Sequence, residues 1–432
     1  MATETMLSEF NYFEPQSVQT SVEEEYDEGI APTADVSRDQ PIDFVVKGAN
    51  GLYRDLNNSY LLVKCKVTKV DKTNLDDNAV VAPVNNLLHS LFQSIDVYIN
   101  GVKQTESNTL YAYRAYIEKL LGYEKQALKS RALTEGFLLD DRGAKMDVVT
   151  LANDGSQNTG FVGRQKWINQ SRIITLVGRP HCDLFHQDRD IPAGVTVQLR
   201  LTMNKDPFVL MGAAALTHIL QVVSVRLVVR TKKLADSLVL AHTRMLTRCN
   251  YRLPLNKVSV SKRTLANGTA TFELGSLFTG NRIPNRVVFA MVTNAASAGA
   301  YNLNPFRFQN FGLTELSMKV NKRMIPFEAL QMDYAHDDYN RAYLNTLAAL
   351  GMDTGNRSLI ISPADWADGY NIYAFKLAAG PSSSEVLTRP EIGDATLKLT
   401  FAAALTAPVD LIVYTETPSL VEIDALGSVV IA

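Results

Sequence analysis

The residues best suited to chemistry lie in one short segment, His181-Cys182-Asp183-Leu184-Phe185-His186-Gln187-Asp188. It holds two imidazoles, a thiol and two carboxylates, which are groups that zinc takes as ligands in proteins. In an extended segment, however, His181, Asp183 and Phe185 share one face while His186 lies on the other, so a single metal centre would need a bend. We therefore expect a loop packed at the end of a β-sandwich, with no bound metal.

Two matches to enzyme motifs lack essential residues. Gly155 to Gly160 has the spacing of a phosphate-binding loop, but Phe161 stands where lysine would reach the β- and γ-phosphates. Ser259-Val260-Ser261-Lys262 matches the serine–lysine pattern of penicillin-binding enzymes, yet no Ser-Asp-Asn or Lys-Thr-Gly partner exists. Glutamate pairs, nucleophile elbows and dinucleotide fingerprints are also missing from suitable contexts. We expect no catalytic or cofactor-binding residue, no cofactor, and a protein that is not an enzyme.

Composition gives no support to nucleic-acid or membrane binding. The basic runs Lys232-Lys233 and Lys262-Arg263 are short and carry no interleaved aromatic residues. No stretch approaches the roughly 18 consecutive apolar residues that span a bilayer, and the amino terminus lacks a secretion signal. We expect no sequence-specific nucleic-acid binding and no membrane span.

The cysteine pattern indicates unpaired thiols. Cys65, Cys182 and Cys249 are odd in number and far apart, which fits neither a disulfide framework nor a clustered zinc site. We expect three buried thiols in a protein made in a reducing compartment.

Charge is distributed unevenly along the chain. Residues 1–40 carry ten acidic side chains and only Arg38, and because the whole chain has a net charge of −2, residues 41–432 carry +7. Such a segment cannot bury enough apolar surface to fold alone, so we expect an arm. It is either a solvated tail or a docking strap whose anchors are Phe10, Tyr12 and Phe13, since a free tail gains nothing from three aromatic residues.

Beyond this arm, alternation of apolar and polar residues is the dominant pattern. In 61–68, for example, Leu61, Val63, Cys65 and Val67 form the apolar set, which is typical of a half-buried strand. Further strands are predicted at 95–99, 195–202, 222–230, 269–274, 286–293, 314–320, 396–402 and 408–415. Helical periodicity is limited to 110–122, 234–246 and 339–350. Many strands with few helices favour antiparallel sandwiches, and 432 residues are too many for one core, so we expect two domains.

An internal repeat supports this division. The strand ending at Ile99 meets a turn at Asn100, and a helix containing Arg114-Ala115-Tyr116-Ile117 follows; in the second half a strand meets Asn321 and a helix contains Arg341-Ala342-Tyr343-Leu344. The strands 225–231 and 409–415 also resemble each other, each as the last strand of its half. Three matches in the same order indicate duplication, with loops of changed length between them.

Long blocks of the sequence resemble hexon-type major capsid proteins of Polinton transposons, adintoviruses and adomaviruses. The blocks that carry the resemblance are 51–67 (GLYRDLNNSYLLVKCKV), 84–102, 111–123, 176–202, 304–321, 369–377 and 411–424. The resemblance covers nearly everything from about residue 41 to 424 and leaves the acidic arm outside. Residues 181–185 fall in a block that recurs in that family without metal chemistry.

The resemblance implies an all-β chain of two tandem eight-stranded jelly-roll β-sandwiches with a few short helices in loops. We expect an acidic arm (1–40), a first jelly roll (41–233), a helical linker (234–248), a second jelly roll (249–420) and a C-terminal tail (421–432). It further implies a major capsid protein in the virion of an icosahedral double-stranded DNA virus, forming pseudo-hexagonal homotrimers. Its partners would be neighbouring capsomers and penton and minor capsid proteins.

Three copies of a two-sandwich chain present six similar wedges, so a trimer can tile a sixfold lattice. The insertions 124–175 and 276–312 are expected to form towers or trimer contacts. Two alternatives remain: a minor capsid or vertex protein, which usually has one jelly roll, and a carbohydrate-binding sandwich, for which Trp167 and Trp366 are the only tryptophans.

Overall fold

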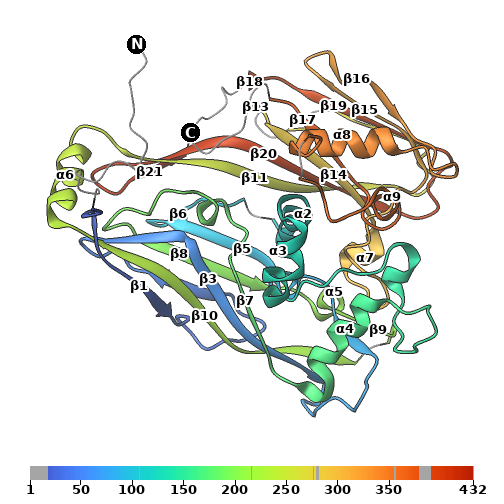
Figure 1. Cartoon of the computed structure of the whole chain (residues 1–432), viewed down its shortest axis with the longest axis horizontal. Coiled ribbons are helices and arrows are strands. Elements are labelled where there is room, and N and C mark those ends of the chain that lie inside the picture. The colour runs from blue at the N-terminus through green and yellow to red at the C-terminus, as the bar shows by residue number, and fades with distance from the viewer. Residues whose placement is uncertain are drawn as a thin grey trace, which may run out of the picture.

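The computed structural model describes residues 18–106, 108–215, 217–275, 277–278, 282–354, 357–378 and 391–431. Two β-sandwiches lie one above the other and are joined at one end through helix α6 (Figure 1). The first half contains the strands β1 (Val22–Ile30), β2 (Ile42–Val46), β3 (Leu52–Lys69), β4 (Val81–Pro83), β5 (Phe92–Ile99), β6 (Val102–Lys103), β7 (Ile174–Gly178), β8 (Val197–Met203), β9 (Leu210–Gly212) and β10 (His218–Leu234). Its helices are α1 (Leu87–Ser90), α2 (Tyr111–Gly122), α3 (Lys125–Lys129), α4 (Thr159–Ile168) and α5 (Asp206–Val209), with 3₁₀ turns η2 (Arg131–Glu135), η3 (Gly143–Asp147), η4 (Asn169–Ser171) and η5 (Asp183–Phe185).

The second half follows α6 (Asp236–Leu246). Its strands are β11 (Tyr251–Leu265), β12 (Thr271–Leu274), β13 (Arg282–Ile283), β14 (Arg286–Thr293), β15 (Leu313–Val320), β16 (Arg323–Gln331), β17 (Ile372–Lys376), β18 (Glu391–Ile392), β19 (Ala395–Phe401), β20 (Val409–Ile423) and β21 (Val429–Ile431). Its helices are α7 (Asn294–Ala298), α8 (Asn340–Leu350) and α9 (Pro363–Ala367). The strands and the three helices predicted from periodicity are confirmed.

The two halves have the same topology. In the first half the sheets run β1-β10-β3-β7 and β2-β8-β5-β6; in the second they run β11-β20-β14-β17 and β12-β19-β15-β16. Taken in chain order, each of the eight strands in the two sheets of the first half has one counterpart in the second. Helix α2 lies between β6 and β7, and α8 lies on the same connection between β16 and β17. Each half is therefore an eight-stranded jelly roll, and the chain is a double jelly roll.

The repeated turn has the same backbone conformation in both halves. Asn100 and Asn321 both have φ 47°, and the residues after them, Gly101 and Lys322, also have positive φ. Two consecutive residues with positive φ are what a tight hairpin needs to match the twist of its strands, and asparagine tolerates that conformation better than most residues. The internal repeat read from the sequence is confirmed at these turns, which lie between β5 and β6 and between β15 and β16.

The acidic segment does not stand wholly apart from the first jelly roll. Val22–Ile30 forms β1, the edge strand that pairs antiparallel with β10, and it is the counterpart of β11 in the second half. Its acids contact cations of the neighbouring strands, with Glu23 bound to Lys233 (3.0 Å), Asp27 to Arg230 (2.6 Å) and Glu28 to Arg54 (2.5 Å). The expectation that all of 1–40 lies outside the first jelly roll is wrong for this strand, because charge pairing replaces the apolar alternation that usually marks a strand.

The two long insertions contact each other. Asp147, in the insertion 124–175, accepts a hydrogen bond from the backbone N–H of Asn304 (2.7 Å) and forms an ion pair with Arg307 (2.5 Å), both in the insertion 276–312. Part of each insertion is therefore used to join the two jelly rolls within one chain.

The chain ends and linker also differ from expectation in detail. Helix α6 has no buried residue. Cys249, just after this helix, is exposed, so the prediction of three buried thiols holds only for Cys65 and Cys182.

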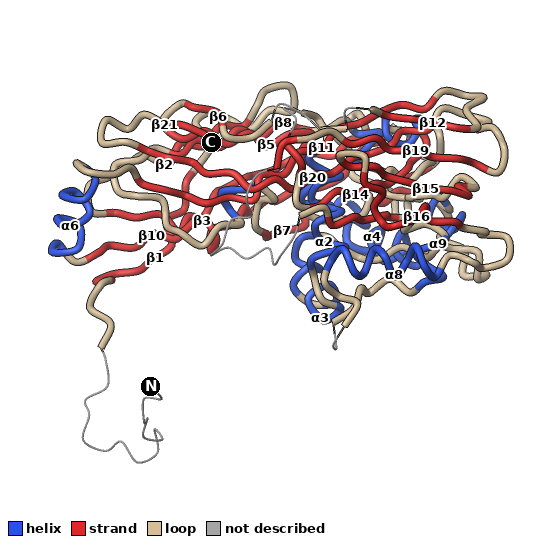
Figure 2. Tube along the Cα trace, turned by 90° about the horizontal axis from the view of Figure 1, so that it is seen from above, coloured by secondary structure: helices blue, strands red, loops and turns tan. Residues whose placement is uncertain are grey.

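The C-terminal tail folds back onto the second half, because β21 pairs with the end of β20. Figure 2 shows α6 at one end of the molecule, with α2, α3 and α8 gathered along one side. Among the helices of the described ranges, none is long and apolar enough to cross a membrane.

Candidate functional site

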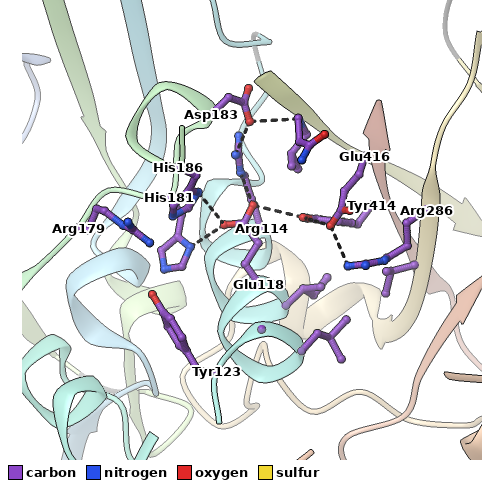
Figure 3. A pocket seen from close by; sticks show the side chains of 16 residues that line it. Arg114, Glu118, Tyr123, Arg179, His181, Asp183, His186, Arg286, Tyr414 and Glu416 are labelled. Carbon is purple, nitrogen blue, oxygen red and sulfur yellow. Dashed lines mark hydrogen bonds and ion pairs between the residues drawn. The ribbon is translucent and has the colours of Figure 1, made fainter. Parts of the chain in front are cut away.

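A polar cavity lies where the two jelly rolls meet. It is a cavity of about 260 Å³ lined by α2 and the 179–186 segment of the first roll and by β11, β14 and β20 of the second. Figure 3 shows that its charged and polar side chains point toward one another across the junction.

Helix α2 supplies the two central groups, Arg114 and Glu118. They lie one helical turn apart on the same face, and Arg114 Nε donates to Glu118 Oε1 at 2.8 Å. Arg114 Nη2 donates to Asp183 Oδ1 at 2.5 Å, and the same oxygen accepts the backbone N–H of Val258 in β11 at 3.1 Å. Asp183 thereby links α2 of the first roll to the first strand of the second.

The second jelly roll contributes an adjoining polar chain. The Tyr414 hydroxyl lies 3.0 Å from Glu416 Oε1 and 3.4 Å from Glu118 Oε1, and Arg286 forms an ion pair with Glu416 at 3.4 Å. These side chains come from β14 and β20, the two inner strands of the sheet that faces α2 (Figure 3). The site is thus built by both rolls and exists only when they are docked.

The 3₁₀ turn η5 brings His181 and His186 to the same carboxylate. His181 Nδ1 lies 2.6 Å from Glu118 Oε2, and His186 Nδ1 lies 3.8 Å from it. The sequence-based picture of an extended segment with the two histidines on opposite faces is wrong, because η5 supplies the bend. Cys182 is buried, which raises the pKa of its thiol.

Burial and charge set the protonation states. Burial opposes ionisation of Glu118, but Arg114 and His181 outweigh it and hold the pKa of Glu118 well below its usual range. Burial lowers the pKa of His181 to about 4 and that of His186 to about 3, although Glu118 acts in the opposite direction on both. At neutral pH the two imidazoles are therefore neutral and the carboxylate is ionised.

Two triplets in this region have ligand atoms close enough to share a metal ion. Glu118, His181 and His186 form one; His89, Glu135 and His181 form the other, and in each the ligand atoms lie within 4.8 Å of one another. In the second triplet Glu135 Oε2 is already bound by Lys119 Nζ and by His89 Nε2 (3.0 Å), so a buried ammonium occupies the position a cation would take.

A second junction, fully buried, lies beside α4. Asp140 accepts hydrogen bonds from Arg164 Nη2 (2.7 Å), Asn158 Nδ2 (2.9 Å) and, across the junction, Asn304 Nδ2 (3.0 Å). The side chains of Arg164 and Asp140 are both 0% exposed. Nearby the Tyr116 ring of α2 stacks on Phe306 with centroids 4.2 Å apart, so aromatic packing and the Asp140–Asn304 hydrogen bond hold the same contact.

The remaining predicted motifs are structural. Asn158 caps α4 through the Gly160 N–H and Phe161 is buried, so the 155–160 loop begins a helix. Ser259 and Lys262 lie in β11, with Lys262 paired to Asp410 at 3.1 Å. The proposed arm anchors Phe10, Tyr12 and Phe13 lie outside the described residues. Sequence reasoning missed Arg114 and Glu118 as site residues; the signal was an i,i+4 ion pair on a helix with apolar neighbours.

No family model matches the chain. Among curated proteins, an uncharacterized protein of Caenorhabditis elegans, F54H12.2, is 22% identical over 408 residues, which cover 90% of this chain and 93% of that protein.

Several solved structures are similar over nearly the whole chain. A chain of the Sputnik virophage matches with a TM-score of 0.63 at 10% identity, covering 100% of this chain and 93% of that chain. The Faustovirus major capsid protein matches with a TM-score of 0.56 at 8% identity (97% and 92% covered), and the mavirus major capsid protein with 0.52 at 12% (100% and 96%). At these identities the likeness shows the fold, a double jelly roll whose counterparts include viral major capsid proteins.

Proposed function

We propose that this chain is a major capsid protein that forms pseudo-hexagonal homotrimeric capsomers in the icosahedral shell of a double-stranded DNA virus. The observation that carries the proposal is the full-length match of a double jelly roll to chains of that architecture, two of which are described as major capsid proteins. The proposed role is structural, and the polar groups at the cavity between the two jelly rolls serve to hold the rolls in one orientation.

The proposed tile requires that the two jelly rolls of each chain are held at a fixed angle. Because both halves share one topology, three chains present six similar wedges around a threefold axis. A tile of this kind needs a fixed angle between the two rolls of each chain. The buried contacts through Asp183 and Asp140 supply that rigidity, since each links the first roll to the second.

Two alternatives are weaker. A minor capsid or vertex protein would need only one jelly roll, and the repeated topology argues against it. A carbohydrate-binding sandwich would need exposed aromatic rings in a groove, but Trp366 is fully buried and donates its indole N–H to the Ile372 carbonyl at 2.7 Å.

We place the virus or virus-like element near the Polinton group. The sequence blocks that resemble this lineage support the placement. The protein would act in the virion after assembly in the host cell, with neighbouring capsomers and penton and minor capsid proteins as partners.

We propose domain limits that follow the topology: a first jelly roll from 22 to 233, a linker at 234–248 and a second jelly roll from 249 that includes the tail strand β21. The segment before Val22 would be the docking arm, with Phe10, Tyr12 and Phe13 as the anchors that bind a neighbouring subunit or a minor capsid protein.

Negative-stain images of the purified full-length protein test this proposal. The expected result is flat six-cornered particles with threefold symmetry, since three chains with two wedges each would form one tile. Uniform fivefold particles would support the vertex alternative, and compact particles of single-chain size would contradict the capsomer proposal.

A further inference from the structure

The groups at the inter-roll cavity form an arrangement suited to a metal ion. Two imidazole nitrogens and one carboxylate oxygen converge from α2 and the 181–186 segment, and a cavity lies beside them (Figure 3). Three protein ligands with an open fourth position are typical of zinc sites that keep a water or exogenous ligand.

The distances require only a small adjustment. Ligands of one tetrahedral zinc ion, each about 2.0–2.2 Å from the metal, lie about 3.4 Å apart. His186 Nδ1 is already 3.8 Å from Glu118 Oε2, whereas His181 Nδ1, at 2.6 Å, is at hydrogen-bond distance. Binding would therefore need the His181 ring to withdraw by roughly 1 Å from the carboxylate.

An unpaired atom in the metal-free arrangement supports the same conclusion. His181 is buried, and when its Nδ1–H donates to Glu118, Nε2 becomes a bare acceptor with no hydrogen-bond partner among the described residues. If Nδ1 binds a metal instead, the hydrogen moves to Nε2, which becomes a donor. The Glu135 carboxylate, within 4.8 Å of a His181 ring nitrogen, would be a nearby acceptor for that hydrogen after a small shift.

The surroundings also orient the carboxylate. Arg114 Nε binds Glu118 Oε1, which leaves Oε2 facing the histidines. Arg114 Nη2 binds Asp183. Arg179 lines the same cavity, but its guanidinium donates to the side chain of Asn57. Among the described residues, neither guanidinium contacts Glu118 Oε2, the oxygen that faces the histidines, whereas Lys119 is bound to the carboxylate of the His89–Glu135–His181 triplet.

We propose that Glu118, His181 and His186 bind one divalent transition-metal ion of the zinc class at the junction of the two jelly rolls. Two imidazoles and a carboxylate suit zinc, cobalt and nickel better than magnesium or calcium, which prefer oxygen ligands. The ion fastens α2 to the turn that carries Asp183, and so it strengthens the contact of Asp183 with β11. The inference does not depend on the capsid role.

Cobalt binding to the full-length, chelator-treated protein tests the proposal directly. Cys249 is exposed beside His242, so all variants carry Cys249→Ser to remove an adventitious surface site. Titration with Co²⁺ alone should give one equivalent per chain with the intense visible bands of four-coordinate cobalt, and Zn²⁺ should displace it. His186→Ala should weaken binding by at least about 100-fold, because a direct ligand contributes more than an outer-sphere contact.

A matched control is His336→Ala. His336 also pairs with a carboxylate, Asp333, at 2.7 Å, but lies exposed on the second roll, so its loss should leave cobalt binding unchanged. Glu118→Gln keeps the side-chain shape and should also weaken binding, and circular dichroism checks that each variant is folded. Absence of stoichiometric binding, or equal binding by the parent and His186→Ala, would overturn the proposal. So would binding that is abolished by His89→Gln but kept by His186→Ala, since that result assigns the other triplet.

Discussion

Replacing Asp140 by alanine is expected to lower the free energy of unfolding by about 3–5 kcal/mol, because it leaves the Arg164 guanidinium buried without its counter-ion. Arg164 is fully buried, and its remaining bonds go to the backbone carbonyls of Pro83 (2.8 Å) and Leu138 (2.9 Å), which do not neutralise its charge. The same substitution removes the acceptor for Asn304 across the junction. Urea denaturation, followed through the first unfolding transition, measures the effect.

Two further variants separate the buried charge from other causes. Asp76→Ala removes an exposed pair with Lys69, and we expect a change below about 1 kcal/mol. The double variant Asp140→Leu with Arg164→Met removes both charges and should recover much of the loss, since an apolar pair of similar size avoids the desolvation of two ions. A cost of Asp140→Ala no larger than that of Asp76→Ala would contradict the prediction that Arg164 depends on Asp140 as its counter-ion.

Truncation at two points is expected to separate folding from assembly. Removing residues 1–40 deletes β1, and we expect the free energy of unfolding to fall by on the order of 3 kcal/mol or more. The lost ion pairs contribute about 0.2–1 kcal/mol each and the lost hydrogen bonds between strands about 0.5–1.5 kcal/mol each. It also exposes the edge of β10, so aggregation should rise. Removing only residues 1–17 leaves β1 in place, and thermal unfolding should remain that of the full chain.

The shorter truncation and the triple variant Phe10→Ala, Tyr12→Ala, Phe13→Ala should reduce the yield of assembled particles, since buried aromatic anchors dominate small interfaces. Electron microscopy of particles and a thermal melt of the same samples give the two readouts. A normal particle yield from both variants would show that residues 1–17 are a solvated tail with no role in assembly. An unchanged melt after removal of 1–40 would contradict the place of β1 in the first sandwich.

The strands could be predicted where one face is buried. In β3 the predicted apolar residues Leu61, Val63, Cys65 and Val67 are all buried, and the internal repeat correctly placed α2 and α8 on equivalent connections. Strand β1 could not be recognised in this way, because its acids are exposed and are matched by cations about 200 residues later in β10. Only the paired sheet shows that complementarity.

The inter-roll site was predictable in part for a similar reason. The two histidines and Asp183 were identified from their spacing, but the bend at η5 and the Glu118 carboxylate that joins the histidines depend on tertiary contacts. Local sequence gave Glu118 only as a charged residue beside the apolar stripe of α2. In the same way, nothing near Asp140 in sequence indicates that its partner Asn304 lies in the second half of the chain.

The mass of the purified protein in solution, measured by light scattering at micromolar concentration, tests the central claim most directly. We expect a homotrimer, with three times the mass of the 432-residue chain, because the proposed tile needs three chains to present its six wedges. A stable monomer or a pentamer under these conditions would contradict it.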